Sequence, residues 1–256
     1  MPIIVTRLLT TAVKGLRMRE AEQVELDRGG ALGDRAFYVI DKRGRMVNGK
    51  QIGELQTVVA DYDRDARELT LTFPDGTAVH GPLKRGDPVR TRFFSRELEA
   101  RLVGGPWAAA LSEHVGRPLR LVEPEIGVDR GLDGVASLIS TASVDRLARE
   151  TGQAKVDPRR FRMLIEVDGV EAHEEDGWVG RSVSVGAARL TMNGHVGRCL
   201  ITSRDPDTGE VDLPTLDALG AYRRDVPSTE PLPFGIYGRV LEPGIVRVGD
   251  AIDLDG

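Results

Sequence analysis

The sequence predicts a mainly β (α+β) fold divided into two β-rich units. Short apolar runs, some strictly alternating with polar residues, recur along the chain, and turn residues separate them. Helical spacing of apolar residues is confined to a few short segments, and strands and helices do not alternate as they do in parallel α/β folds. With 256 residues, the chain is long enough for one large domain or two small ones.

The first unit, residues 1–95, is predicted to be a small β-barrel-like domain built from hairpins. Its predicted strands are the apolar runs at residues 3–9, 36–40, 58–62 and 69–73. The last of these alternates cleanly, and Pro74-Asp-Gly76 closes it as a turn. We expect residues 58–62 to pair with it.

The segment from residue 96 to residue 115 differs from the strands before it. Several of its apolar residues recur at roughly helical spacing: Leu98, Leu102, Trp107, Ala110 and Leu111. The sequence Gly-Gly-Pro at residues 104–106 predicts a break in this helix. Residues 117–122 read as a strand. The boundary between the units is expected between residues 90 and 118.

The second unit, residues 105–256, is predicted to combine strands with peripheral helices. A helix is expected at residues 140–150, where a Ser or Thr cap precedes apolar residues at helical spacing. A shorter helix is expected at residues 213–222, with Pro214 near its first turn. The predicted strands are residues 163–167, 182–185, 188–192, 200–202 and 246–254.

Composition limits the classes of protein to which this chain can belong. The formal net charge of −5 does not indicate a surface for nucleic acids. A single cysteine cannot form an internal disulfide, which suits a reducing compartment. The N-terminus lacks the apolar stretch of a signal peptide, and no run approaches the ~20 apolar residues of a membrane-spanning helix. We therefore expect a cytoplasmic protein that binds neither nucleic acid nor membranes.

The segment from residue 197 to residue 209 is the most informative for chemistry. Cys199 lies between Arg198 and a predicted strand, and a neighbouring guanidinium favours the thiolate, which is both nucleophile and metal ligand. Arg204 adds a second cation, and the turn sequence Asp-Pro-Asp-Thr-Gly at residues 205–209 places Cys199 beside a loop. The residues alone leave open that Cys199 is a small buried hydrophobe.

His195 lies four residues before Cys199. If the segment is a continuous strand, the two residues share a face. His195 would then serve as a catalytic base or raise the thiolate fraction. A histidine at a loop end, facing solvent, is the alternative.

The Arg-Cys-Leu-Ile-Thr sequence at residues 198–202, with the loop that follows, resembles the cysteine motif of the MOSC (molybdenum cofactor sulfurase C-terminal) superfamily. The branch it resembles is that of the amidoxime-reducing components and their bacterial relatives. Further segments resemble family motifs in the same order: residues 12–15, 33–40, 160–162, 174–178, 233–237 and 244–250.

The resemblance implies a fold and a ligand. The expected fold is an N-terminal MOSC β-barrel domain followed by a MOSC β-barrel with peripheral helices, and the expected cofactor is the molybdenum pyranopterin. Cys199 would be the molybdenum ligand. The residues that would contact the pterin or its phosphate are Lys14, Arg35, Arg162, Arg198 and, in a looser match, Ser137 and Asp133, with Arg130 as a further cation.

The chain departs from the family pattern at four positions. Met163 and Leu164 stand where the family has Pro-Asn, Gly197 stands for the Ser before Arg-Cys, and Gly15 stands for the Ser after the early Lys. These changes remove hydroxyl and amide groups that could hold the cofactor. Backbone N–H groups at the two glycines are possible substitutes, since phosphates bind glycine-lined backbone.

The function implied by the resemblance is a molybdenum-dependent oxidoreductase that reduces small N-oxygenated substrates. Such an enzyme works with a separate electron-transfer protein. One alternative is a sulfur carrier or transferase with a persulfide on Cys199. Another is a protein without the cofactor, either a lyase or isomerase with Cys199, an acid or His195 as base, or a small-anion binding module.

Overall fold

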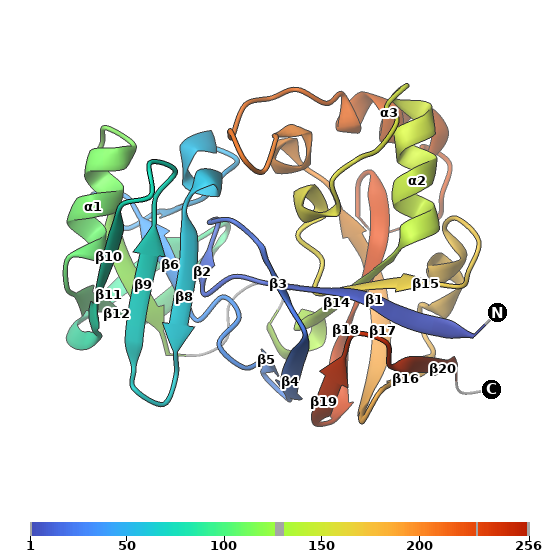
Figure 1. The fold of residues 1–256 in the computed structure, drawn as a ribbon, viewed down its shortest axis with the longest axis horizontal. Helices are drawn as coiled ribbons and strands as arrows, with labels where there is room; N and C mark the ends of the chain where they lie inside the picture. Colours follow the sequence, from blue (N-terminus) through green and yellow to red (C-terminus); the bar gives the residue numbers. More distant parts are fainter. Residues whose placement is uncertain (1, 126–130, 229, 255–256) are drawn as a thin grey trace.

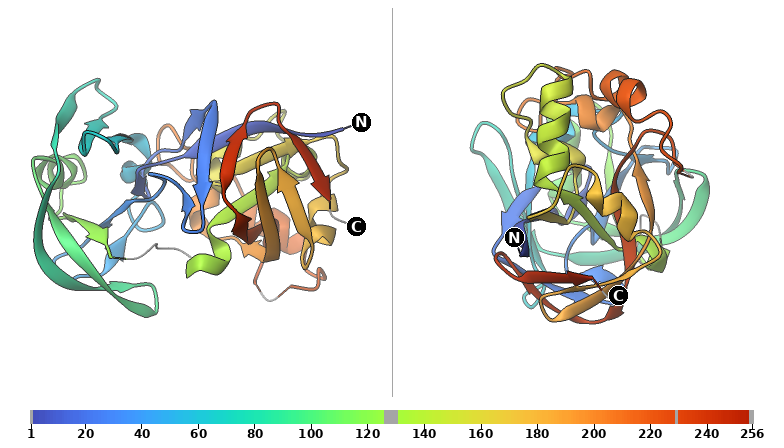
Figure 2. Two further views of the ribbon diagram at one scale, coloured as in Figure 1. Left: turned by 90° about the horizontal axis from the view of Figure 1, so that it is seen from below. Right: turned by 90° about the vertical axis from the view of Figure 1, so that its right-hand side faces the viewer.

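The computed structural model describes residues 2–125, 131–228 and 230–254. Two β-rich halves lie side by side, and β1 (Ile3–Thr10) begins at the far end of the second half and runs across it towards the first (Figure 1). The first and last strands of the chain are neighbours, because β1 pairs with β20 (Ala251–Leu254). Figure 2 shows the two ends of the chain together at the far end of the second half.

The second half is a closed seven-stranded barrel. Its strands pair in the order β15 (Ile165–Asp168), β14 (Ala136–Ser140), β18 (Pro233–Glu242), β17 (Ala188–Gly197), β16 (Ser182–Val185), β20 and β1, and β1 returns to β15. All neighbours are antiparallel except β14 and β15, which are parallel. Closure leaves no unpaired strand edge in the barrel. β3 (Arg19–Ala21) pairs with the end of β1 outside it.

The barrel core follows from the period of two along each strand. In β16, Val183 and Val185 are fully buried, whereas Ser182 and Ser184 are only partly buried. In the pairing of β1 with β15, Val5 lies opposite Val167, and both side chains are fully buried. Apolar residues at alternate positions therefore fill the barrel.

The first half contains two sheets and a helix. One sheet has the order β11 (Lys84–Phe93), β12 (Arg96–Gly104), β13 (Arg120–Pro124), β6 (Phe37–Ile40) and β2 (Val13–Lys14), with β7 (Met46–Val47) on β6. The other has the order β10 (Ala78–Pro82), β9 (Glu68–Thr72) and β8 (Val59–Asp63). Helix α1 (Trp107–His114) packs between them through Trp107, whose Nε1 donates to the carbonyl of Leu69 at 2.9 Å.

The two halves exchange strands. β1 is part of the barrel although it opens the chain, and β4 (Gln23–Asp27) pairs with β19 (Gly244–Arg247) near the end of the chain and with β5 (Gly30–Ala31). β12 and β13 belong to the first half. The division into residues 1–95 and 105–256 stays a prediction, and strand pairing crosses it.

Two helices cover the upper end of the barrel, α2 (Thr141–Glu150) and α3 (Thr215–Tyr222) (Figure 1). Ser140 caps α2, since its hydroxyl accepts from the backbone N–H of Ser143 at 3.1 Å. The short 3₁₀ helices are η1 (Gly53–Thr57), η2 (Gly131–Gly134), η3 (Pro158–Phe161), η4 (Glu174–Trp178) and η5 (Leu200–Ser203). Within the described part of the chain, no helix is long and apolar enough to cross a membrane.

The predicted fold class is confirmed, and three of the predicted elements are wrong. Residues 96–104 form strand β12 instead of a helix, because Leu98, Ala100 and Leu102 also fit a period of two and β11 pairs along their length. Residues 200–202 lie in η5 and not in a strand. The strand predicted at residues 246–254 is divided into β19 and β20 by a turn at residues 248–250.

Candidate active site

A cavity of about 930 Å³ lies between the two halves and is lined by Cys199. Its volume is within the range of pockets that hold small-molecule ligands and cofactors. The first half contributes Lys14, Arg35, Asn48, Phe94, Ser95 and Arg96. The barrel half contributes Ser137, Arg162, Met163, Arg198 and Cys199. The structure thus brings together the residues that the cysteine motif and the early Lys and Gly-Asp-Arg motifs single out.

Cys199 lies just beyond the end of β17 and immediately before η5. Its side chain is partly buried, and it is not sealed in an apolar core. The carbonyl of Cys199 accepts hydrogen bonds from the backbone N–H and the hydroxyl of Thr202, both at 3.0 Å. The backbone of the cysteine is therefore fixed by the turn that follows it, while its side chain lines the cavity.

Arg198 is buried and donates to backbone carbonyls. Its Nε and Nη2 donate to the carbonyl of Phe234, the former at 2.8 Å, and its Nη1 donates to the carbonyl of Phe161 at 2.8 Å. The guanidinium also lies 5.7 and 5.8 Å from the two ring centroids. Arg198 therefore joins η3 and β18 to the segment that carries Cys199. A carbonyl oxygen has no formal charge, so these bonds do not cancel the charge of the guanidinium.

Arg35 and Arg162 link the two halves of the chain. Arg35 Nη2 donates to the carbonyl of Arg162 at 2.8 Å, and Arg162 Nη2 donates to the carbonyl of Leu16 at 2.7 Å. Arg35 Nη1 also pairs with Asp34. Both arginines have left-handed backbones, with φ of 49° and 56°. Such conformations are costly for side chains other than glycine and concentrate at functional sites.

Lys14 and Ser137 also line the cavity. Lys14 Nζ lies 5.6 and 5.9 Å from the ring centroids of Phe93 and Phe94. The Ser137 hydroxyl accepts from the backbone N–H of Leu164 at 3.0 Å. Asp133 and Arg130 are the other two residues that the family resemblance suggests. Asp133 is not among the cavity-lining residues, and Arg130 lies outside the described residues.

The two glycines that replace family serines are required by the local backbone. Gly15 has a φ of +94°, and a Cβ there would lie 2.8 Å from Cβ of Asn48. A Cβ at Gly197 would lie 2.9 Å from the carbonyl oxygen of Pro231. Both distances are shorter than ordinary van der Waals contacts of a Cβ atom. A serine at either position would therefore require neighbouring atoms to shift, which explains why this chain has glycine there.

His195 does not share a face with Cys199, because β17 ends at Gly197, before the cysteine. The histidine is buried, is not among the residues that line the cavity, and lies with Nε2 3.5 Å from Oδ1 of Asp176. The other carboxylate oxygen of Asp176 accepts from Arg223 at 2.7 Å. The condition for a shared face, a strand that continues to Cys199, is therefore not met. The alternative of a histidine that faces solvent is wrong, because the side chain is buried. The role as base stays a prediction.

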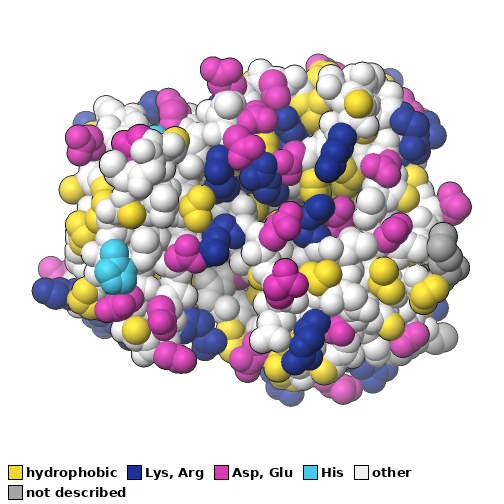
Figure 3. All heavy atoms as spheres, in the orientation of Figure 1, with side chains coloured by type: hydrophobic (Ala, Val, Ile, Leu, Met, Phe, Trp, Pro, Cys, Tyr) yellow, Lys and Arg dark blue, Asp and Glu magenta, His cyan; other side chains and the backbone are white. Residues whose placement is uncertain are grey.

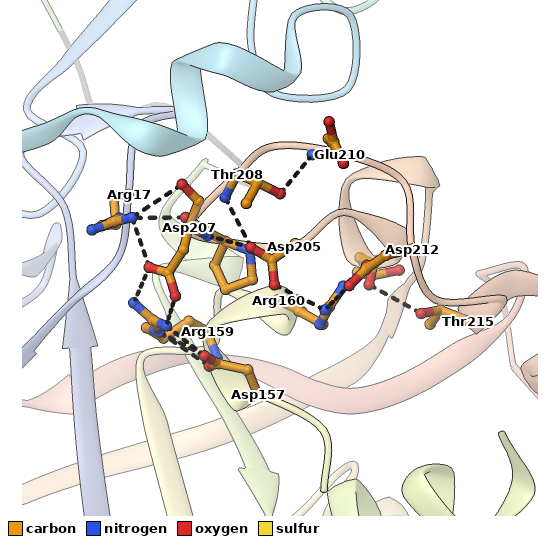
Figure 4. Close-up of polar contacts among 12 residues, drawn as sticks. Arg17, Asp157, Arg159, Arg160, Asp205, Asp207, Thr208, Glu210, Asp212 and Thr215 are labelled. Carbon is orange, nitrogen blue, oxygen red and sulfur yellow. Dashed lines mark hydrogen bonds and ion pairs between the residues drawn. The ribbon is translucent and has the colours of Figure 1, made fainter. Parts of the chain in front are cut away.

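The loop after Cys199 is fixed by ion pairs that the sequence analysis missed (Figure 4). Buried Arg160 binds Asp212 at 2.6 and 2.8 Å, and Arg159 binds Asp207 at 2.8 Å. The hydrogen bond from each arginine lowers the pKa of its carboxyl partner. The Arg-Arg pair and the Asp-rich loop were visible in the sequence, but nothing there joined them.

Arg17 completes this cluster from the first half, since it lies 2.6 Å from Asp207. Figure 3 shows Lys and Arg side chains gathered in the middle of the face, between the two halves, with acidic side chains beside them. A second cavity of about 700 Å³ is lined by Arg17, Arg159, Arg160 and Lys155. Every arginine that lines it is paired with a carboxylate: Arg7, Arg17, Arg19, Arg159 and Arg160. Cys199 lines the larger cavity instead.

Comparison with known sequences agrees with the geometry. Residues 125–253 match the family model of the MOSC domain, and residues 3–118 match that of the MOSC N-terminal beta barrel domain. The chain belongs to the MOSC family. Mitochondrial amidoxime-reducing component 1 of Xenopus laevis is 29% identical over 285 residues, which cover 97% of this chain and 81% of that protein.

Two further matches also cover most of this chain. Human mitochondrial amidoxime reducing component 2 is 29% identical over 270 residues, which cover 93% of this chain and 78% of that protein. The crystal structure of the YUAD protein from Bacillus subtilis is 14% identical with a TM-score of 0.47, covering 98% of this chain and 94% of that one. In this MOSC chain, the cavity therefore lies between the two regions that the family models match.

Proposed function

We propose that this MOSC protein is an oxidoreductase that reduces small N-oxygenated compounds, with a molybdenum cofactor held through Cys199. The observation that carries the proposal is the position of the only thiol of the chain in a large cavity shared with Lys14, Arg35 and Arg162. Relatives named amidoxime-reducing components align over nearly the whole chain, which supports the substrate class.

The donor set of the cavity fits such a cofactor. A thiolate is a soft ligand that suits a molybdenum centre. Arginine and lysine side chains, together with the backbone N–H of Gly15, can bind the phosphate of the pterin. The chain would thus bind one end of the cofactor through Cys199 and the other through cations from both halves.

The protein's own residues provide position and electrostatics. Arg198 holds the cysteine segment through the carbonyls of Phe161 and Phe234, and Arg160 holds the following loop through Asp212. When bound, the cofactor supplies two-electron oxygen-atom chemistry. The electrons would come from a separate electron-transfer protein, and the partly exposed cavity would admit a small substrate.

Metal analysis and turnover test the proposal together. The chain is expressed in cells that make the cofactor, and molybdenum per chain is measured for wild type and Cys199→Ser. Reduction of benzamidoxime to the amidine and water is measured for both with a reduced viologen dye as the two-electron donor. We expect molybdenum in the wild type, and at least about a hundredfold loss of turnover in a variant that melts like the wild type. Wild-type protein without molybdenum or turnover would exclude this function.

A persulfide on Cys199 is the second candidate, favoured by a partly exposed cysteine next to a buried arginine. Intact mass spectrometry distinguishes the two. A gain of one sulfur that a thiol removes, seen in wild type and absent from Cys199→Ser, would support sulfur transfer. Molybdenum binding without any such adduct would favour the reductase.

A further inference from the structure

The hairpin between β11 and β12 has an unusual residue at its tip. Phe93 pairs with Arg96, so the loop consists of Phe94 and Ser95 alone. Phe94 has a φ of +53°, while Ser95 is not among the residues with positive φ. A two-residue loop with positive φ only at its first position is the turn that normally carries glycine there. A bulky side chain at positive φ is uncommon, so turn chemistry does not explain Phe94.

The ring of Phe94 is held in place at the edge of the cavity. It is 58% exposed, and Phe94 lines the cavity together with Ser95 and Arg96. Its ring centroid lies 5.1 Å from that of Phe93 in an edge-to-face contact, and Phe93 itself is fully buried against Tyr38. Lys14 Nζ lies 5.9 Å from the ring. The strained residue is therefore supported by the ring of Phe93 and remains exposed where it lines the cavity.

We propose that Phe94 is a specificity-determining residue that contacts an aromatic or planar apolar part of the substrate. The first half of the chain would thereby contact the apolar part of the substrate. Cys199, on the other half, would hold the cofactor at which the N-oxygenated group reacts. Aromatic rings gain most in offset or edge-to-face contact at 4.5–7 Å, which an exposed, fixed ring permits. This inference rests on the reductase function proposed above.

Two substrates and two variants test it in the full-length, cofactor-loaded protein. Benzamidoxime carries a ring, and acetamidoxime does not. Phe94→Gly should raise KM for benzamidoxime about fivefold, with kcat and the constants for acetamidoxime unchanged. Phe94→Tyr keeps the ring and should retain the wild-type preference. Because glycine suits the left-handed turn, Phe94→Gly should melt at or above the wild-type temperature.

Val248→Ala is the matched control, because Val248 is another exposed apolar residue, 41% exposed, that does not line the cavity. We expect Val248→Ala to leave the KM values for benzamidoxime and acetamidoxime unchanged. An equal loss of preference in Val248→Ala and Phe94→Gly would overturn the inference, since the effect would then come from exposed apolar area in general.

Calorimetric binding separates this inference from the proposed function. If the wild type reduces both substrates and Phe94→Gly leaves their relative KM and affinity unchanged, the role of Phe94 is overturned and the reductase stands. If the wild type reduces neither but binds benzamidoxime more tightly than acetamidoxime, and Phe94→Gly removes the difference, the reductase fails, while the contact of Phe94 with an aromatic ligand stands. Equal affinity of the wild type for both compounds overturns the role of Phe94 in every case.

Discussion

The two walls of the cavity are built in different ways. The cysteine wall, residues 198–212, is held by buried Arg198 on backbone carbonyls and by Arg160 on carboxylates. The hairpin wall, residues 93–96, is held by the contact between the rings of Phe93 and Phe94 and lies largely exposed. The wall with the thiol is fixed by directional hydrogen bonds, and the opposite wall rests on ring packing.

The difference fits the separate tasks of the two walls. Charge-assisted hydrogen bonds are short and strongly directional, so they fix a reacting group within a narrow range of positions. Ring contacts are weaker and less directional, so they contribute less to the stability of the fold, and they leave the exposed ring available to contact a substrate. We therefore expect changes in the cysteine wall to affect stability strongly, and changes in the hairpin wall to affect substrate preference.

The largest effect on stability is expected from Arg198→Met, which breaks the cysteine wall. Methionine fills the space of the stem but leaves the carbonyls of Phe161 and Phe234 buried without this donor, at a cost of about 3 kcal/mol in the free energy of unfolding. Urea denaturation measures the loss. Arg239→Met, at an exposed position of β18, is the control and should leave the midpoint unchanged. Equal midpoints for the two variants would contradict the assigned role of Arg198.

Arg160→Ala tests the loop of the same wall. Its loss leaves Asp212 and Asp205 without their arginine, and we expect a decrease of about 2 kcal/mol, since Asp212 is half exposed. Arg90→Ala removes the exposed pair with Glu99 and should produce no measurable shift. Denaturation midpoints at low and high salt give the comparison. If only Arg90→Ala lost stability, and lost it in a salt-dependent way, the exposed pair would be the more important of the two, contrary to this prediction.

Gly15→Ser restores the hydroxyl of the family motif next to Lys14, on the hairpin side of the cavity. We expect a loss of about 2 kcal/mol, because the new Cβ has both a left-handed φ and Asn48 at 2.8 Å. Gly76→Ser is a matched control, since Gly76 has a φ of +85° with no atom within 4 Å of a Cβ. Thermal melts should place Gly76→Ser between wild type and Gly15→Ser. The reverse order would show that Asn48 moves aside.

The smallest effect concerns His173, whose ring lies 5.8 Å from that of Phe234, the residue whose carbonyl accepts from Arg198. Burial, followed by the charges of Arg223 and Arg146, lowers the pKa of His173 to about 4 from an unfolded value of 6.5. Between these values the unfolded chain binds a proton that the folded chain does not, so stability falls as the pH drops from about 6.5 towards 4.

His173→Asn should remove this dependence, and asparagine tolerates the left-handed φ of 67° at this position. The loss of stability between pH 7 and pH 5 should become smaller by on the order of 1 kcal/mol, once solvent screening is allowed for. Urea denaturation at both pH values measures it. A variant with the pH dependence of the wild type would mean that other groups cause it.

Part of the cavity could be predicted from local sequence, and the rest depends on contacts between distant segments. The motifs pointed to Cys199, Arg35 and Arg162, because each lies in a short sequence with its own chemistry. The ion pair of Arg160 with Asp212 joins residues 52 positions apart, and no local pattern encodes it. The failed helix at residues 96–104 has a similar cause, since only the neighbouring strand distinguished a period of two from helical spacing.

The sequence by itself determined the β-rich class, the turn positions and the single thiol beside an arginine, because alternation and turn chemistry act between residues close in the chain. Only the tertiary structure decided that His195 lies against Asp176 instead of the cavity, and that Gly15 has no room for a side chain. The direction of a side chain and the space beside a backbone depend on atoms from distant segments. Their positions are set only when segments that are distant in the chain pack against each other within each half.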